Sequence, residues 1–330
     1  MNDGLQYLSL SHPRRRGFTL IVIASSPQTR LSRARSTVSN PSCHIPVMLD
    51  EVLEWLAPAP GQRIVDGTFG GGGHTAALAE QVGPDGRVYA LDLDEEAIER
   101  SQPVVEALPV DLAIGSYTKI PEMLASCDVQ KVAGILLDLG LSSDQLADEE
   151  RGFSFQSAGT LDLRFDRSRG EAAWQLLERL DERSLANIIY QYGEERLSRR
   201  IARQIVEQRR KAPIRTADEL AKLIRSCVPR SRGHDIDPAT RTFQALRIAV
   251  NQELSSLEQA LERLPDCLSP GGRLAIISFH SFEDRLVKHA FRNDQRLDVL
   301  TKRPLRPAAA EVAANPRARS AKLRVAQRID

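Results

Sequence analysis

Two kinds of hydrophobic pattern alternate between residues 44 and 140 of the 330-residue chain. Short, nearly continuous apolar runs predict strands at 63–69, 87–94, 110–117 and 131–140. Segments whose apolar residues recur at helical spacing predict helices at 44–56, 74–82, 95–108 and 120–127. Because single helices separate the strands, the pattern predicts an α/β fold with a parallel, doubly wound sheet and right-handed crossovers.

This alternation stops after residue 140. A loop rich in Gly, Ser and Asp leads into a stretch with helical patterns only, so residues 141–240 are predicted to form an all-helical insertion. A long helix at 240–264 then returns to the sheet. The remaining predicted elements are a strand at 273–279, a helix at 281–291, and two strands at 297–303 and 321–328. We expect the last two strands to pair antiparallel at the sheet edge.

The first 43 residues lack apolar periodicity and are rich in Ser and Arg but poor in acids. Three origins fit this composition: a disordered tail, an organellar transit peptide, or a start codon assigned too early. We therefore place residues 1–43 outside the fold, and expect a sheet domain formed by 44–140 and 241–330. The apolar run FTLIVIA is far shorter than the roughly 18 residues that a membrane span needs, so we expect no membrane partner.

The formal net charge of +1 hides three basic segments. Lys and Arg outnumber Asp and Glu by 6 to 1 in residues 1–43, by 12 to 5 in 193–233 and by 8 to 2 in 301–330. Charge runs often only solvate helix faces, but three in one chain favour a polyanionic partner. The four cysteines lie far apart without the spacing of a metal site or a disulfide scaffold, which fits reduced thiols in a cytosol-like compartment and no metal.

A run of four glycines, Gly70–Gly73, joins the first predicted strand to the next helix in the segment IVDGTFGGGGHTAAL. A flexible loop is one interpretation. The other is a loop whose main chain approaches a ligand more closely than a Cβ atom permits. In a doubly wound sheet, this junction directs backbone amides and the positive helix end at the ligand. Gly71, Gly73 and Ala76 also match the G-x-G-x-x-A spacing of dinucleotide-binding loops, a weak signal by itself.

Acidic residues at the ends of the predicted strands narrow the choice of ligand. Asp92 ends the second strand, where a carboxylate accepts hydrogen bonds from both hydroxyls of an adenosine ribose. Asp94 is either a second ribose ligand or the N-cap of the next helix. Asp66, at the head of the glycine loop, would repel a pyrophosphate by roughly 1 kcal/mol or more but can face the ammonium group of a methionine moiety, directly or through a water. The acids therefore favour S-adenosylmethionine over a dinucleotide.

A series of ordered sequence blocks resembles the ribosomal RNA small subunit methyltransferase H family and covers most of 44–328. The blocks are HIPVMLDEV, DGTFGGGGHT, ILLDLGLSSDQL, RGFSF, LDLRFD, YGEER, ATRTFQALRIAVNQEL, GGRLAIISFHSFEDRLVK and NPRARSAKLR. The resemblance implies a Rossmann-like class I methyltransferase that uses S-adenosylmethionine and carries a helical substrate-recognition insertion. It also implies the reaction, which is methylation of N4 of a cytidine in the decoding region of 16S rRNA within the 30S subunit.

The cofactor-binding residues of that family carry over by position. They are Gly72, Gly73 and His74 in the loop, Asp92 on the ribose, Tyr117 beside the adenine, Asp138 near the methionine end and Gln145 just beyond it. Two positions depart from the family pattern. Tyr117 stands where Phe is frequent and keeps the stacking plane. Asp144 stands where Pro is frequent, which puts only the local turn in doubt.

The reaction needs hydrogen-bond acceptors beside the methyl group, because the lone pair of cytosine N4 is delocalised into the ring. Asp138, which ends the fourth strand, is the first catalytic candidate. His280, after the fifth strand, is the second, although a His at a strand end is often structural. Many amino-group methyltransferases carry a D/N-P-P-Y/F/W motif where this chain has DLGL, so the motif does not decide between them. We expect the target base to be splayed out of its stack.

For contacts to RNA, the sequence indicates basic ranges and aromatic residues rather than individual positions. Arginines within 196–215 and 303–324 are natural phosphate contacts. Phe153, Phe155 and Phe165 are expected either to flank the substrate pocket or to pack between the insertion and the sheet.

Two other functions stay open at this point. An NAD-dependent oxidoreductase is favoured only by the G-x-G-x-x-A spacing, and a non-catalytic RNA-binding or assembly factor would keep the same fold. The oligomeric state is open, with a homodimer as one alternative. The expected location is the cytoplasm, or an organelle if residues 1–43 are a transit peptide.

Overall fold

The computed structural model describes residues 19–21, 45–155, 158–228 and 237–330. The chain divides into two compact units, which we call the sheet unit and the helical unit. The sheet unit consists of the described residues up to Gly140 together with Leu257–Asp330, and the helical unit is Leu141–Ser256.

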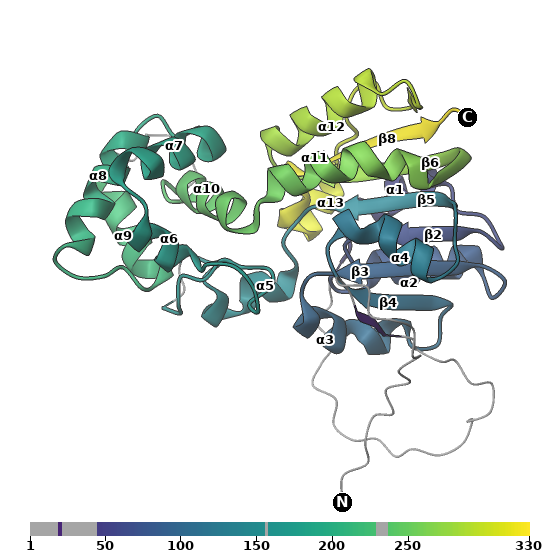
Figure 1. The fold of residues 1–330 in the computed structure, drawn as a ribbon, viewed down its shortest axis with the longest axis horizontal. Coiled ribbons are helices and arrows are strands. Elements are labelled where there is room, and N and C mark those ends of the chain that lie inside the picture. The colour runs from purple at the N-terminus through teal and green to yellow at the C-terminus, as the bar shows by residue number, and fades with distance from the viewer. Residues whose placement is uncertain (1–18, 22–44, 156–157, 229–236) are drawn as a thin grey trace, which may run out of the picture. The chain divides into compact units, whose positions relative to one another are not determined.

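The described part of the sheet unit contains an eight-stranded sheet (Figure 1). In sheet order, its strands are β1 (Thr19–Ile21), β4 (Val110–Ile114), β3 (Arg87–Asp92), β2 (Arg63–Asp66), β5 (Val132–Asp138), β6 (Leu268–Ser278), β8 (Lys322–Arg328) and β7 (Leu297–Val299). The pairs from β4 through β6 are parallel, whereas β1–β4, β6–β8 and β8–β7 are antiparallel. The predicted doubly wound sheet and the antiparallel pairing of the last two strands are confirmed.

Helices pack on both faces of this sheet. One core contains residues of α1 (Leu49–Leu56), α2 (Gly73–Val82) and α3 (Glu95–Val105); the other contains residues of α4 (Ile120–Ser126), α11 (Glu253–Arg263, from Leu257 on) and α12 (Ser281–Asn293). Strand side chains alternate between these cores, since Ile135 and Leu137 of β5 join one and Leu136 joins the other. The near-continuous apolar run of β5 in the sequence reflects this burial on two faces.

The order of the strands determines where a ligand can bind. β2 pairs with β3 on one side and with β5 on the other, both in parallel register. The chain therefore leaves the carboxyl end of β2 in one direction along the sheet and returns to β5 on the other side. This reversal at the ends of β2 and β5 is the topological switch point, where doubly wound sheets bind their ligands.

Two elements of the sheet unit were not predicted. Thr19–Ile21, inside the segment placed outside the fold, forms β1 and pairs with β4. The predicted loop between β7 and β8 contains a short helix, α13 (Ala309–Ala314). Glu311 of α13 accepts a hydrogen bond from the Met48 amide at 2.7 Å, so this helix holds the segment that precedes α1.

The prediction of one long helix at 240–264 is wrong. The segment forms two helices, α10 (Thr240–Asn251) and α11, which are separated by Gln252. Gln252 has a φ of 52°, a left-handed conformation that ends a helix. The insertion was predicted to end at residue 240. However, α10 packs against α7 (Glu182–Gly193), and the helical unit ends at Ser256.

The helical unit has a core of its own. Its other helices are α5 (Ser143–Ala147), α6 (Ala173–Arg179), α8 (Ser198–Arg209) and α9 (Ala217–Cys227). Phe153 stacks on Phe165 with ring centroids 5.8 Å apart, and Phe155 meets Phe243 edge to face at 5.9 Å. The three phenylalanines singled out in the sequence thus take part in the packing of this core.

None of the helices in the described ranges is long and apolar enough to cross a membrane. Cys127, Cys227 and Cys267 are free thiols, and Cys43 lies outside the described residues.

Candidate active site

The glycine loop joins β2 to α2 at the switch point. Gly70 and Gly72 have φ values of 50° and 77°, which only glycine adopts without strain. Gly72 is the N-cap of α2, and no side chain caps this helix start. A Cβ at Gly72 would lie 3.1 Å from the Phe69 ring, and one at Gly73 would lie 3.1 Å from Pro46. These glycines therefore serve backbone geometry and protein packing as well as any approach of a ligand.

Asp92, at the carboxyl end of β3, braces this loop. Its Oδ2 accepts a hydrogen bond from the Gly70 amide at 2.7 Å, and its Oδ1 accepts one from the Asp94 amide at 2.9 Å. Burial raises the pKa of Asp92 to about 6, although the amides of Asp94 and Gly70 oppose this shift. The side chain is partly exposed, and each oxygen keeps a second lone pair for a further donor. Asp92 is thus fixed in place with acceptor capacity to spare.

Asp94 does the structural job that was one of its two predicted roles. Its carboxylate accepts a hydrogen bond from the Ala97 amide at 3.3 Å and caps α3. It is buried, unlike Asp92.

Asp66, at the end of β2, has no exposed surface. Its Oδ2 accepts a hydrogen bond from the Thr75 hydroxyl at 2.6 Å, and its Oδ1 accepts one from the Thr68 amide at 3.1 Å. Burial raises the pKa of Asp66. Burial leaves the Asp66 carboxylate no surface for direct contact with an ammonium group, so of the two predicted modes only the one through a water stays a prediction. This carboxylate instead ties the loop to the first turn of α2.

Asp138 and His74 form a pair at the switch point. The Nδ1 atom of His74 lies 3.8 Å from Oδ2 of Asp138. The Nε2 atom lies 3.0 Å from the carbonyl oxygen of Val47, which can only accept, so Nε2 carries a proton. Nδ1 is consequently the atom that can share a second proton with Asp138. Burial raises the pKa of Asp138 to about 6, while the charge of His74 and the Gly140 amide oppose this shift.

Thr68 is a site residue that the sequence analysis missed. Its hydroxyl accepts a hydrogen bond from the Asp138 amide at 2.7 Å and lies 3.4 Å from Oδ1 of Asp66, to which it donates. One hydroxyl thus joins the carboxyl ends of β2 and β5. The only signal in the sequence is a hydroxyl residue inside the DGTFGGGG segment, and it does not reveal the partner from β5.

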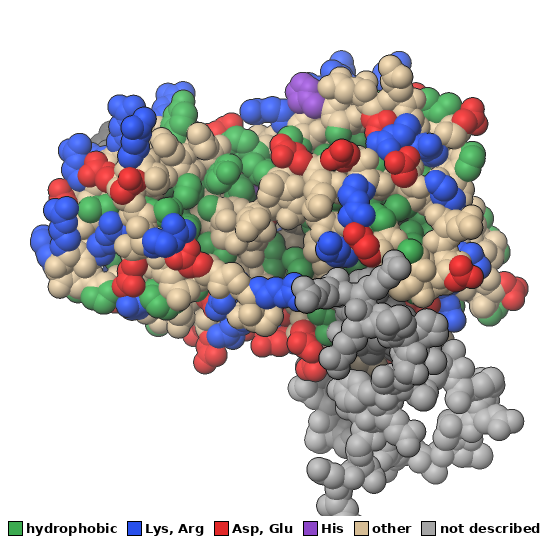
Figure 2. Space-filling model, in the orientation of Figure 1, with side chains coloured by type: hydrophobic (Ala, Val, Ile, Leu, Met, Phe, Trp, Pro, Cys, Tyr) green, Lys and Arg blue, Asp and Glu red, His purple; other side chains and the backbone are tan. Residues whose placement is uncertain are grey.

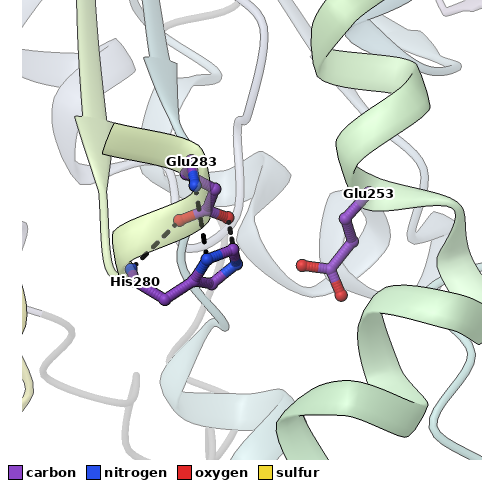
Figure 3. A group of neighbouring side chains, drawn as sticks. All are labelled: Glu253, His280 and Glu283. Carbon is purple, nitrogen blue, oxygen red and sulfur yellow. Dashed lines mark hydrogen bonds and ion pairs between the residues drawn. The ribbon is translucent and has the colours of Figure 1, made fainter. Parts of the chain in front are cut away.

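His280 and Glu283 occupy the end of β6 and the start of α12 (Figure 3). Nδ1 of His280 accepts a hydrogen bond from the Glu283 amide at 3.4 Å, and Nε2 lies 3.1 Å from Oε1 of Glu283. The Glu283 carboxylate in turn accepts a hydrogen bond from the Phe279 amide at 2.9 Å. The His280 amide donates to the same carboxylate at 3.3 Å, which completes a capping box, whereas Nε2 of His280 is buried without a hydrogen-bond partner among the described residues. Glu253, also drawn, belongs to the helical unit, where it pairs with Arg247 at 2.8 Å.

Tyr117 and Gln145 are the two remaining predicted cofactor contacts. Tyr117 follows β4, begins a short 3-10 turn and is partly buried against the core of the sheet unit. A Cβ at Gly67 would lie 3.0 Å from its Cβ, so Tyr117 stands beside the glycine loop. Gln145 lies in α5 of the helical unit, where its Oε1 accepts a hydrogen bond from the Ser142 amide. The structure thus gathers every predicted contact except Gln145 in the sheet unit.

The carboxyl groups give this edge of the sheet its electrostatic character. The charge of Asp66 raises the pKa of both Asp92 and Asp138, after burial as the main cause. Three acids on neighbouring strands therefore lie within electrostatic reach of one another. Such an edge attracts a cationic ligand and repels a pyrophosphate.

A doubly wound sheet with a glycine loop and acids at its switch point, and with an antiparallel strand inserted next to β6, is a class I methyltransferase fold. The chain belongs to the MraW methylase family, whose match covers residues 41–329.

Curated relatives agree with this assignment. A ribosomal RNA small subunit methyltransferase H from Rhodopirellula baltica is 50% identical over 298 residues, which cover 87% of this chain and 92% of the relative. A protein of the same name from Deinococcus radiodurans is 49% identical and covers 93% of this chain and 97% of the relative. One from Thermomicrobium roseum is 46% identical, with 90% and 98% covered.

Proposed function

We propose that this protein transfers a methyl group from S-adenosylmethionine to N4 of a cytidine in the decoding region of 16S rRNA, with the 30S subunit as substrate. The names of its relatives support a small-subunit rRNA substrate. The observation that carries the proposal is the pair of partly exposed acids, Asp92 and Asp138, on the two sides of the glycine loop at the switch point.

The residues at this edge fit S-adenosylmethionine. We propose that Asp92 binds the ribose hydroxyls, Tyr117 flanks the adenine, and Gly72 and Gly73 with His74 present the loop to the amino-acid end, with Asp138 beyond. The cofactor, when bound, supplies an electrophilic methyl group on a positively charged sulfur. Acidic neighbours suit that charge, whereas they would repel the phosphates of NAD. The G-x-G-x-x-A spacing of the loop therefore does not indicate a dinucleotide here.

Asp138 is the proposed catalytic acceptor. As the N4–carbon bond forms and the carbon–sulfur bond breaks, the amino nitrogen becomes positive and must lose a proton. A carboxylate that accepts a hydrogen bond from this amino group returns electron density to nitrogen and can take the proton. Asp138 suits this role because its pKa, raised by burial to about 6, lies close to the working pH.

His74 is a positioning residue in this account. Its Nε2–H group donates to the Val47 carbonyl, so the ring is fixed with Nδ1 toward Asp138. Asn315, just after α13, donates from Nδ2 to the Ile45 carbonyl, and Glu311 accepts from the Met48 amide, which holds the segment carrying Val47. His280 caps α12 through Nδ1, which accepts a hydrogen bond from the Glu283 amide, and its ring lies against the Glu283 carboxylate. We therefore favour Asp138 over His280 as the group that meets the base.

The test is methyl transfer to 30S subunits that lack the modification, with labelled S-adenosylmethionine and mapping of the labelled nucleotide by mass spectrometry. The expected product is a single N4-methylcytidine in 16S rRNA. Label on another base would overturn the substrate and leave the cofactor assignment standing. Tight cofactor binding with no transfer would indicate an assembly factor instead. If residues 1–43 act as a transit peptide, the same reaction takes place on organellar ribosomes rather than in the cytoplasm.

A further inference from the structure

The arginines of the helical unit differ in whether they already have partners. Arg209 donates to the carbonyl oxygens of Leu177 and Leu180, and Arg215 pairs with Glu178 at 2.8 Å while it stacks on Trp174. Such arginines hold the unit together and have little freedom to bind a ligand.

A second group has no such partners. No ion pair or side-chain hydrogen bond within the described residues engages the exposed cations that flank and begin α8, which are Arg196, Arg199, Arg200, Arg210 and Lys211. From 196 to 211 the chain carries seven Lys and Arg and one Glu, a net charge of +6. Figure 2 shows Lys and Arg side chains gathered over the region of α8.

The geometry of α8 directs these charges outward. Ile201, Ala202, Ile205 and Val206 are buried on one side of the helix. Arg203 follows Arg199 by four residues and Arg200 by three, so these three exposed side chains share the opposite face, where Arg203 also pairs with Glu182 at 3.6 Å. Arg199 and Arg200 also stand in the first turn, which has no acidic residue, although positive charge there opposes the helix dipole. Residues that break a local rule in this way are often kept for function.

An aromatic side chain accompanies the basic stripe. Tyr190, in the last turn of α7, is 60% exposed and is the only aromatic among the large exposed hydrophobic residues of the described chain. The short connection from Glu194 to Leu197 links this turn to the start of α8. Arginines beside an exposed aromatic ring form the kind of surface that binds an RNA backbone and stacks an unpaired base.

The basic segment near the C-terminus is different, and it serves as a contrast. Arg324 is 5% exposed and pairs with Asp284 at 2.6 Å, and Lys322 pairs with the same carboxylate at 3.2 Å. Among the arginines of 303–324 that were predicted as natural phosphate contacts, Arg324 is therefore a poor candidate, because its charge is already paired inside the sheet unit.

We propose that the outward face of α8, with Tyr190, is the surface that binds the phosphate backbone of the substrate RNA next to an unpaired base. This inference rests on the proposed function, since it names the surface that recognises the rRNA. An acidic protein is the other class of partner that a basic face can attract.

The test measures binding separately from methyl transfer. Affinity for 30S subunits and for a 16S rRNA fragment is measured across salt concentrations without cofactor, for wild type, Arg199→Ala/Arg200→Ala and Arg179→Ala. Arg179, at the end of α6, has a side chain that is 60% exposed and paired with Glu171, so Arg179→Ala removes the same kind of charge from the same unit. The double variant should bind about 10-fold more weakly, and its slope of log K against log salt should fall by about 2. Arg179→Ala should match wild type.

Further readouts separate this inference from the proposed function. Tyr190→Ala should bind about 5-fold more weakly with an unchanged salt slope, and Tyr190→Phe should restore binding. Affinity for S-adenosylmethionine should not change in any of these variants. Three results would overturn the proposal that this face binds RNA. They are normal RNA binding by the double variant, an equal loss of binding in Arg179→Ala, and polyglutamate that competes as well as RNA does. If the variants lose RNA binding as predicted but the wild-type protein transfers no methyl group, the result would count against the proposed function and leave the RNA-binding surface standing.

Discussion

The acidic edge of the sheet unit and the basic face of α8 hold their charges in opposite ways. At the edge, Asp92 and Asp138 are largely buried and accept hydrogen bonds from backbone amides, and burial raises the pKa of both carboxyl groups. At the start of α8, Arg199 and Arg200 are exposed and have no ion pair or side-chain hydrogen bond within the described chain. Buried charges act at short range and are screened little by salt, whereas exposed charges act at longer range and are screened strongly. The first arrangement suits chemistry on one small cation, and the second suits capture of a large polyanion.

Substitution of Asp92 should have the largest effect on the acidic edge. Asp92→Ala removes the acceptors for the ribose and the brace on Gly70, so we expect affinity for S-adenosylmethionine to fall about 1,000-fold, at about 1.5–3 kcal/mol for each charged hydrogen bond. Calorimetric titration measures this. The matched control is Asp94→Ala, which removes a helix cap, lowers stability by about 1 kcal/mol and should leave affinity unchanged. Equal losses in both variants would mean that the edge is only structural.

Asp138→Asn should come next, with a loss in turnover rather than in binding. The amide keeps the shape but cannot take a proton from N4, so kcat should fall about 100-fold while Kd for the RNA stays constant. Single-turnover methylation of 30S subunits measures the chemical step. An Asn variant with wild-type kcat would remove Asp138 from the reaction and direct attention to His280.

Asp138→Asn should lower kcat but raise the free energy of unfolding. The pKa of Asp138 is raised from an ordinary value near 4 to about 6 in the folded state, so its contribution to the free energy of unfolding is present below pH 4 and is lost as pH rises to 6. Asp138→Asn should therefore be more stable than wild type by about 3 kcal/mol at pH 8 and equal to it near pH 3. Urea unfolding at several pH values measures the difference. A constant difference across pH would show that the carboxyl group is not desolvated.

His74→Gln should have the smallest effect and the most specific one. The charge of His74 lowers the pKa of Asp138, so its removal should shift the acid limb of the pH–kcat profile upward, and kcat should fall by less than about 10-fold, mainly on the acid side of neutral pH. A loss that is uniform across pH would assign His74 to loop packing through Val47 alone.

The sequence predicted the layers of the sheet unit because each strand and helix has a strong local period, as the alternation of Ile135, Leu136 and Leu137 between two cores illustrates. It also predicted which acids end their strands. It did not predict their environments, because these depend on partners far away in the chain. The Asp138 amide bonds the Thr68 hydroxyl across 70 positions, and Glu311 reaches Met48 across 263.

Two further misses have the same physical origin. Nothing in the local sequence marks the break at Gln252, since Gln is not a residue that favours the left-handed φ that it adopts here. Likewise, counting arginines could not separate Arg324, which is paired with Asp284, from Arg199, which is not. Charge patterns along a chain give the number of cations, and only the fold decides which of them remain available.

The most direct test of the account is a crystal structure of the protein soaked with S-adenosylhomocysteine, the demethylated cofactor product. We expect the ribose hydroxyls of the ligand to donate hydrogen bonds to the Asp92 carboxylate, and its amino-acid end to lie at the glycine loop on the Asp138 side. A ligand bound elsewhere, with this edge of the sheet empty at saturating concentration, would contradict it.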